Sequence, residues 1–190
     1  MPVPIRDRAL LDALEQRARA PFSGTVWRSV RMGRNPTQCW RAGGRWDDKS
    51  FDVLYTSEDR DGTIEERRFH LFRGQPFPPS TIRYELFELR LRLSEVISFL
   101  DLEALQLVGM DTAGFGLASY ADKEVEYPGS QQIAEACFFL GADGIRVPNA
   151  RHKSLNLIVF CEQDTQMDLE IVRNHGLIDW RKKQSYEPES

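Results

Sequence analysis

The stretch from Val26 to Glu66 reads VWRSVRMGRNPTQCWRAGGRWDDKSFDVLYTSEDRDGTIEE and carries most of the reactive chemistry in the sequence. Its first half, up to Trp46, holds five arginines and no acidic residue. Its second half holds an apolar run ending in Tyr55, then a polar turn, then Glu65 and Glu66. Fixed positive charge, an aromatic ring and a carboxylate are the groups that a site for a phosphate-bearing nucleoside needs.

The composition sets bounds on this site. With 190 residues, 41% of them hydrophobic, the chain is expected to form one domain with a substantial core. A net charge of −4 argues against direct nucleic-acid binding and makes the arginine-rich stretch a local attractor of small anions. The N-terminus lacks the apolar core of a signal peptide, and no apolar run is long enough to cross a membrane. We therefore expect a soluble, cytoplasmic protein without membrane contact.

The three cysteines are widely spaced and form no zinc-type pattern with histidine. We expect them to act as small hydrophobic residues in a reducing compartment, and we expect no metal site. The sequence also lacks GxGxxG, P-loop, HExxH and GxSxG motifs, which argues against the standard nucleotide-binding and hydrolase folds.

The hydrophobic pattern predicts an α+β fold, a mixed β-sheet with flanking helices, because helices and strands alternate irregularly. The clearest strand is 84–93, where YELFELRLRL alternates apolar and polar residues. The other elements are predicted by periodicity and by turn residues. Helices are expected at 7–20, 63–72, 100–108 and 130–140; strands at 25–30, 51–56, 144–147 and 155–161; a strand or helix at 169–172; and loops at 76–79 and 109–122.

Each candidate site residue also has a purely structural interpretation. Arg28 and Arg45 are the best anion ligands, yet arginines near tryptophans also stack on them without any ligand. Tyr55 could stack on a planar heterocycle or be a core aromatic with its hydroxyl at the rim. Glu66 could stabilise a sugar cation or complete a capping box with Thr63.

Taken in order, four phrases of the sequence resemble the RES domain, a family of bacterial toxins named for an arginine, a glutamate and a serine. The phrases are VWR at 26–28, GGRW at 43–46, VLYTS at 53–57 and the glutamate eleven residues after Tyr55, Glu66. The segments DGIRVPNAR at 143–151 and LNLIVF at 155–160 resemble, less specifically, the closing segment of the family.

The resemblance implies an ADP-ribosyltransferase-like fold around an NAD cleft, with residues 1–22 as an N-terminal helical extension, 23–180 as the catalytic domain and 181–190 as a polar tail. It implies an NAD glycohydrolase or phosphorylase that releases nicotinamide and passes ADP-ribose to water or inorganic phosphate. Arg28 and Arg45 would hold the diphosphate, Tyr55 would stack near the nicotinamide, and Glu66 would stabilise the oxocarbenium-like transition state. A helix-turn-helix antitoxin would be the protein partner. The sequence leaves the oligomeric state open, a homo-oligomer included.

One position departs from the family pattern. The serine of the family falls at Asn149, which the resemblance places among the NAD-binding residues. Asparagine can donate and accept hydrogen bonds but has no hydroxyl. The segment between Glu66 and Asn149 also suggests an added loop around 109–128. Two alternatives therefore stay open: an ADP-ribosyltransferase acting on a protein, and an NAD-binding module in which Asn149 has impaired the chemistry and Asn149→Ser would restore it.

Overall fold

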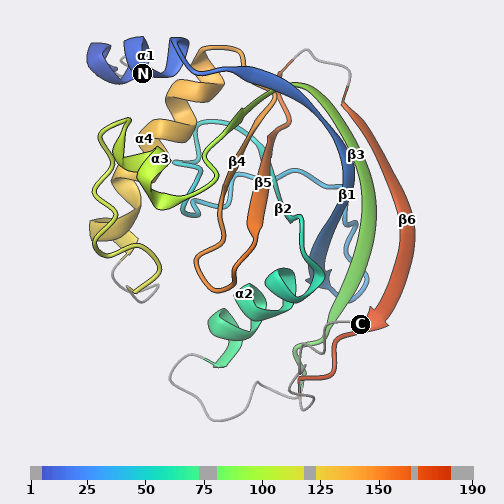
Figure 1. Cartoon of the computed structure of the whole chain (residues 1–190). Helices are drawn as coiled ribbons and strands as arrows, with labels where there is room; N and C mark the ends of the chain where they lie inside the picture. The colour runs from blue at the N-terminus through green and yellow to red at the C-terminus, as the bar shows by residue number, and fades with distance from the viewer. Residues whose placement is uncertain (1–5, 73–80, 118–122, 164–166, 181–190) are drawn as a thin grey trace, which may run out of the picture.

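A computed structural model describes residues 6–72, 81–117, 123–163 and 167–180, and Figure 1 shows their arrangement. The predicted loop at 76–79, part of the predicted loop at 109–122 and the polar tail at 181–190 lie outside the described residues. The helices are α1 Arg8–Glu15, α2 Arg60–Phe72, α3 Leu102–Gln106 and α4 Lys123–Phe139. The strands are β1 Arg19–Arg31, β2 Val53–Ser57, β3 Tyr84–Ser98, β4 Gly144–Pro148, β5 Leu155–Phe160 and β6 Asp168–Leu177.

The strands form one six-stranded sheet in the order β1-β2-β5-β4-β3-β6, with an additional pairing of β1 with β3. That extra pairing closes β1, β2, β5, β4 and β3 into a ring and leaves β6 outside it, along β3. The pairings are antiparallel except for the parallel pairing of β3 with β4, so the sheet is mixed, as predicted. The shortest strand pairing in this ring is the one between β1 and β2, where Trp27 pairs with Ser57.

The longest strand, β3, forms because its sequence alternates apolar and polar residues. Leu89, Leu91 and Leu93 are buried, whereas Arg90 and Arg92 are exposed. The buried leucines belong to one of two apolar clusters, which also includes Val26 and Leu157 from other strands. The second cluster lies where α1, α3 and α4 gather at one side of the sheet (Figure 1).

The helix α2 stands apart from the other three, next to β1 and β2 (Figure 1). It begins at Arg60, three residues before the predicted start, because the Asp59 carboxylate accepts a hydrogen bond from the Gly62 amide at 2.7 Å. Thr63 therefore lies inside the helix, and its hydroxyl donates to the Asp59 and Trp27 carbonyls. The predicted capping box between Thr63 and Glu66 is wrong, which leaves the Glu66 side chain available for another role.

Three further boundaries differ from the prediction. The helix α4 begins at Lys123, so the last part of the loop expected at 109–128, residues 123–128, is helical. The strand β1 begins at Arg19, because it pairs with β3 along almost all of its length. The segment predicted as a strand or helix at 169–172 is part of the strand β6. Non-local pairing with β3 extends both strands into sequences whose own patterns are weak.

The cysteines also correct a prediction. Cys39 and Cys161 form a disulfide, and only Cys137 is free and buried, as expected of a small hydrophobic residue. The disulfide joins the long connection between β1 and β2 to the end of β5. Spacing in the sequence did not reveal this pair, because 122 positions separate its members.

None of the helices that the structure describes has the length and apolar character needed to cross a membrane. Within the same residues, no three histidine, cysteine, aspartate or glutamate side chains gather in a way that could hold a metal ion.

Candidate functional site

A cavity of about 900 Å³ is lined by residues of β1, β2, α2 and the connection 33–46. Four of the predicted site residues line it together: Arg28, Arg45, Tyr55 and Glu66. They come from four different segments, so the fold brings together what the sequence spreads over 39 positions (from 28 to 66). The volume of the cavity is within the range of pockets that hold small molecules and cofactors.

Four arginines that line the cavity have no carboxylate partner in the described structure. We call Arg28, Arg31, Arg34 and Arg67 the arginine wall. In the part of the chain that the structure describes, no carboxylate lies within ion-pair distance of these four side chains. Guanidinium groups without a partner carboxylate can bind an anion.

Within this wall, Arg28 is the residue with a buried nitrogen that has no hydrogen-bond partner in the described structure. Its Nη2 donates to the Gln38 carbonyl at 3.1 Å, but its Nη1 is buried and has no hydrogen-bond partner. Burial, helped by the nearby charge of Arg67, lowers the pKa of Arg28 to about 10. Arg67 is itself fixed, because its Nε and Nη2 donate to the hydroxyl and the carbonyl of Ser29. A buried donor without a partner costs free energy, and an anion in the cavity would recover it.

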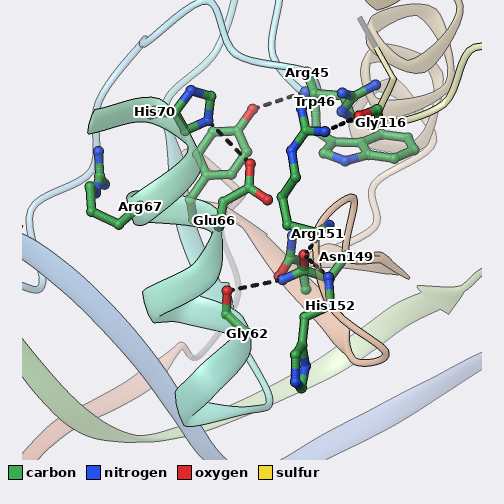
Figure 2. Close-up of polar contacts among 12 residues, drawn as sticks. Arg45, Trp46, Gly62, Glu66, Arg67, His70, Gly116, Asn149, Arg151 and His152 are labelled. Atoms are coloured by element: carbon green, nitrogen blue, oxygen red, sulfur yellow. Dashed lines mark hydrogen bonds and ion pairs between the residues drawn. The ribbon is translucent and has the colours of Figure 1, made fainter. Parts of the chain in front are cut away.

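The carboxylate of Glu66 also has one unsatisfied atom. Figure 2 shows Glu66 projecting from α2 beside Arg151, with Arg67 on the other side of the helix. Its Oε1 lies 3.2 Å from His70 Nε2, one helical turn away, whereas Oε2 is buried and has no partner. The side chain is therefore oriented by one oxygen, whereas the other oxygen is buried without a partner in the described structure, in a residue that lines the cavity.

The electrostatic surroundings keep Glu66 ionised. Burial acts to raise the pKa of Glu66, but the hydrogen bond from His70 and the positive charges of His70, Arg151 and Arg45 outweigh it, and the pKa is lowered. A carboxylate held negative within a partly dehydrated cavity can stabilise positive charge that develops on a ligand.

The hydroxyl of Tyr55 organises the connection that covers it. It accepts a hydrogen bond from the Trp46 amide at 2.9 Å and donates to Asp47 Oδ2 at 3.0 Å. Asp47 is fully buried and also accepts from the amides of Gly43 and Gly44. Burial, followed by the Asp47 charge, raises the pKa of Tyr55 well above its ordinary value, so the hydroxyl stays protonated.

The two glycines of this connection are needed for different reasons. Gly43 has a φ of +68°, in the left-handed region that side chains disfavour. At Gly44, a Cβ would lie 2.6 Å from the Tyr55 hydroxyl oxygen. The left-handed backbone at Gly43 and the close approach of Gly44 to Tyr55 together explain why GGRW contains paired glycines.

Arg45 is neutralised by the protein, unlike the arginine wall. Its Nη1 forms an ion pair with Glu126 on α4, and its guanidinium lies 4.7 Å and 4.9 Å from the ring centroids of Phe115 and Tyr127. The Glu126 Oε1 also accepts from the Gly116 amide. We call Arg45, Tyr55 and Glu66 the paired wall, because each has a polar partner that fixes its position: Glu126, Asp47 and His70.

Asn149 is buried beside the cavity, and its neighbours Pro148 and Ala150 line it. Its Nδ2 donates to the Asn156 side chain at 3.0 Å and to the Gly62 carbonyl at 3.4 Å. Its Oδ1 accepts from the amides of Arg151 and His152 (Figure 2). In the described structure the amide of Asn149 thus connects the turn after β4 to the first turn of α2.

The sequence did not reveal several residues that shape the site. Asp47, Glu126 and Arg151 act on the paired wall, although Asp47 directly follows GGRW and is a recognisable turn-forming residue. Arg151 lies with its guanidinium carbon 3.3 Å from the Phe69 ring centroid and donates to the Gly116 carbonyl. Its approach to Glu66 depends on the tertiary fold and leaves no local pattern.

Comparisons with known proteins show which protein fold and which family this chain resembles. No curated protein sequence matches the chain. Among solved structures, a chain of the M. tuberculosis MbcT–MbcA toxin–antitoxin complex is similar, with a TM-score of 0.71 and 19% sequence identity, over 90% of this chain and 92% of that one. The α+β architecture is therefore shared with that protein. The family model described as "RES domain" matches residues 8–181, and the chain belongs to the RES domain family.

Proposed function

We propose that this protein is an NAD-cleaving enzyme, a glycohydrolase or phosphorylase, and the toxin of a toxin–antitoxin pair. The observation that supports the chemistry best is the buried, unsatisfied Oε2 of Glu66, a residue that lines the same cavity as the arginine wall, which has no counter-charge among the described residues. NAD carries both complements: a diphosphate for the arginines, and a ribose that becomes positively charged when its bond to nicotinamide breaks.

The reaction needs little besides orientation and charge. The C–N bond between ribose and nicotinamide breaks, its electron pair leaves with the nicotinamide nitrogen, and the ribose becomes oxocarbenium-like. Glu66, ionised and oriented by His70, stabilises that cation from Oε2. Water then attacks the ribose carbon and loses a proton, which gives ADP-ribose. Attack by inorganic phosphate at the same carbon gives the phosphorylated sugar instead.

The remaining site residues position the substrate in this proposal. Arg28 binds the diphosphate through its unpartnered Nη1, and Arg45, held in place by Glu126, donates a hydrogen bond to the same diphosphate. The ring of Tyr55 lines the cavity and stacks near the nicotinamide, while its hydroxyl stays bound to Asp47. Asn149 supports the first turn of α2, and hence the direction of Glu66.

The test is release of nicotinamide from NAD by the purified protein, with and without phosphate. Glu66→Gln should lower the rate by roughly 10²-fold to 10³-fold, because the amide carries no charge to stabilise the ribose cation. Glu65→Gln is the matched control, since Glu65 pairs with Arg68 and is not among the residues lining the cavity. No release by the wild type, or equal release by a folded Glu66→Gln protein, would sink the proposal. Labelled NAD in a cell lysate separates the transferase alternative, because only a transferase leaves label on a protein.

The partner in this proposal is a small helix-turn-helix antitoxin that covers the cavity. The similar chain belongs to a toxin–antitoxin complex, and family membership supports the same arrangement here. Co-expression with the product of a neighbouring reading frame of that type should yield a complex that no longer releases nicotinamide. A complex with undiminished activity would contradict this arrangement.

A further inference from the structure

Trp40 is the one tryptophan among the described residues that is both mostly exposed and on the cavity. Its side chain is 64% exposed, whereas Trp46 is 2% exposed. Trp27 packs on His175 and Trp180 on Tyr84, but in the described structure no aromatic ring or cation packs on the indole of Trp40. An indole left open to solvent at a cavity wall is a surface on which a planar group can stack.

The backbone of Trp40 is held rigidly although its side chain is open. Its amide donates to the Val53 carbonyl at 3.0 Å, and its carbonyl accepts from the Val53 amide at 3.3 Å. On one side Cys39 is bonded to Cys161, and on the other Arg41 pairs with Asp52 and Glu162. A fixed backbone lowers the entropy that a ligand must overcome when it stacks on the indole.

The position of Trp40 relative to the other groups suggests what stacks there. Arg28 interacts electrostatically with Arg67, which directly follows Glu66, and its Nη2 donates to the carbonyl of Gln38. Arg28 therefore lies between the helix that carries Glu66 and the segment that carries Trp40. A dinucleotide with its reactive ribose at Glu66 and its diphosphate at Arg28 would extend its second base toward Trp40.

We propose that Trp40 is the stacking platform for the adenine of the dinucleotide, and so sets the preference for NAD over its mononucleotide half. This inference rests on the proposed function for the identity of the ligand. It assigns the adenylate half to the connection 33–46, whereas the reactive half is bound by α2 and β2.

The test uses AMP and nicotinamide mononucleotide as separate probes of the two halves, with binding measured by calorimetry and by tryptophan fluorescence. AMP should quench the fluorescence of the wild type saturably. In Trp40→Ala the dissociation constant for AMP should rise about tenfold, the loss expected for one base–aromatic stack, while binding of the mononucleotide stays unchanged. Trp40→Phe should retain most of the affinity for AMP, because it keeps an aromatic face.

Trp180→Phe is the matched control for the fluorescence change, since Trp180 is not among the residues lining the cavity. Circular dichroism checks that each variant is folded. The proposal is overturned if the wild type does not bind AMP, if Trp40→Ala binds AMP as the wild type does, or if both probes weaken equally. These outcomes do not depend on turnover. Absence of nicotinamide release with Trp40-dependent AMP binding would refute the proposed reaction and leave the adenine site standing.

Discussion

The arginine wall and the paired wall line the same cavity but differ in whether the protein supplies partners for their side chains. On the paired wall, Arg45 has Glu126, Tyr55 has Asp47 and Glu66 has His70. On the arginine wall, Arg28 keeps a buried nitrogen without a partner, and its pKa is lowered to about 10. Partners fix a side chain at the cost of its freedom to bind, so the paired wall is suited to orientation and the arginine wall to capture of an anion.

The largest expected effect on stability comes from removing the ion-pair partner of a residue on the paired wall. Glu126→Gln removes the counter-charge of Arg45, whose side chain is only 10% exposed. Breaking a buried ion pair leaves an uncompensated charge, so the free energy of unfolding should fall by about 3 kcal/mol in urea denaturation. Glu124→Gln, in the same helix but exposed, is the control and should change stability little. Equal stability of the two variants would show that the Arg45–Glu126 pair has no structural role.

Removing charge from the arginine wall should have the opposite effect on stability. Arg28→Gln eliminates a half-buried cation that lacks a counter-charge in the described structure, so the free protein should be as stable as the wild type or more stable. Because the pKa of Arg28 is below its ordinary value, the cost of the charge is present at neutral pH and fades only above about pH 10.

The same substitution should weaken the binding of ADP-ribose about 100-fold, as expected for loss of charge-assisted hydrogen bonds. Calorimetric titration measures this, with Arg31→Gln as a milder comparison because Arg31 is exposed. An Arg28→Gln protein that is less stable, yet binds ADP-ribose as before, would reverse the roles assigned to the two walls.

The smallest effect concerns pH and the pair of Glu66 with His70. In His70→Ala, burial still raises the pKa of Glu66 while the opposing hydrogen bond and charge are lost. The acid limb of the rate of nicotinamide release should therefore move to higher pH, with little change at pH 8, where Glu66 is ionised in both proteins. His70→Gln, which can still donate to Oε1, should move the limb less. A limb that stays in place in His70→Ala would mean that His70 does not tune Glu66.

The α+β class and the candidate residues were predictable because they depend on local patterns. Strand β3 follows from its strict alternation, and Arg28, Arg45, Tyr55 and Glu66 follow from four phrases in family order. All four line one cavity, although their roles there stay predictions.

The parts that could not be predicted depend on distant neighbours. The Arg45–Glu126 pair joins residues 81 positions apart, and Glu126 lies in a segment whose sequence suggested a loop. The sequence predicts a polar turn before α2, whereas the Asp59 carboxylate in that turn caps the helix, so α2 begins three residues earlier than predicted. The place of Asn149 depends on Gly62 and Asn156, which only the folded sheet brings near.

The disulfide between Cys39 and Cys161 also determines how the protein behaves after its backbone is cleaved by a protease. A protease that cuts the backbone once between these two residues opens a covalent loop and releases nothing. The two fragments stay attached through the cystine, and the cut protein keeps its full mass until a reductant is added. Electrophoresis without reductant would therefore hide nicking over a sequence separation of 122 residues.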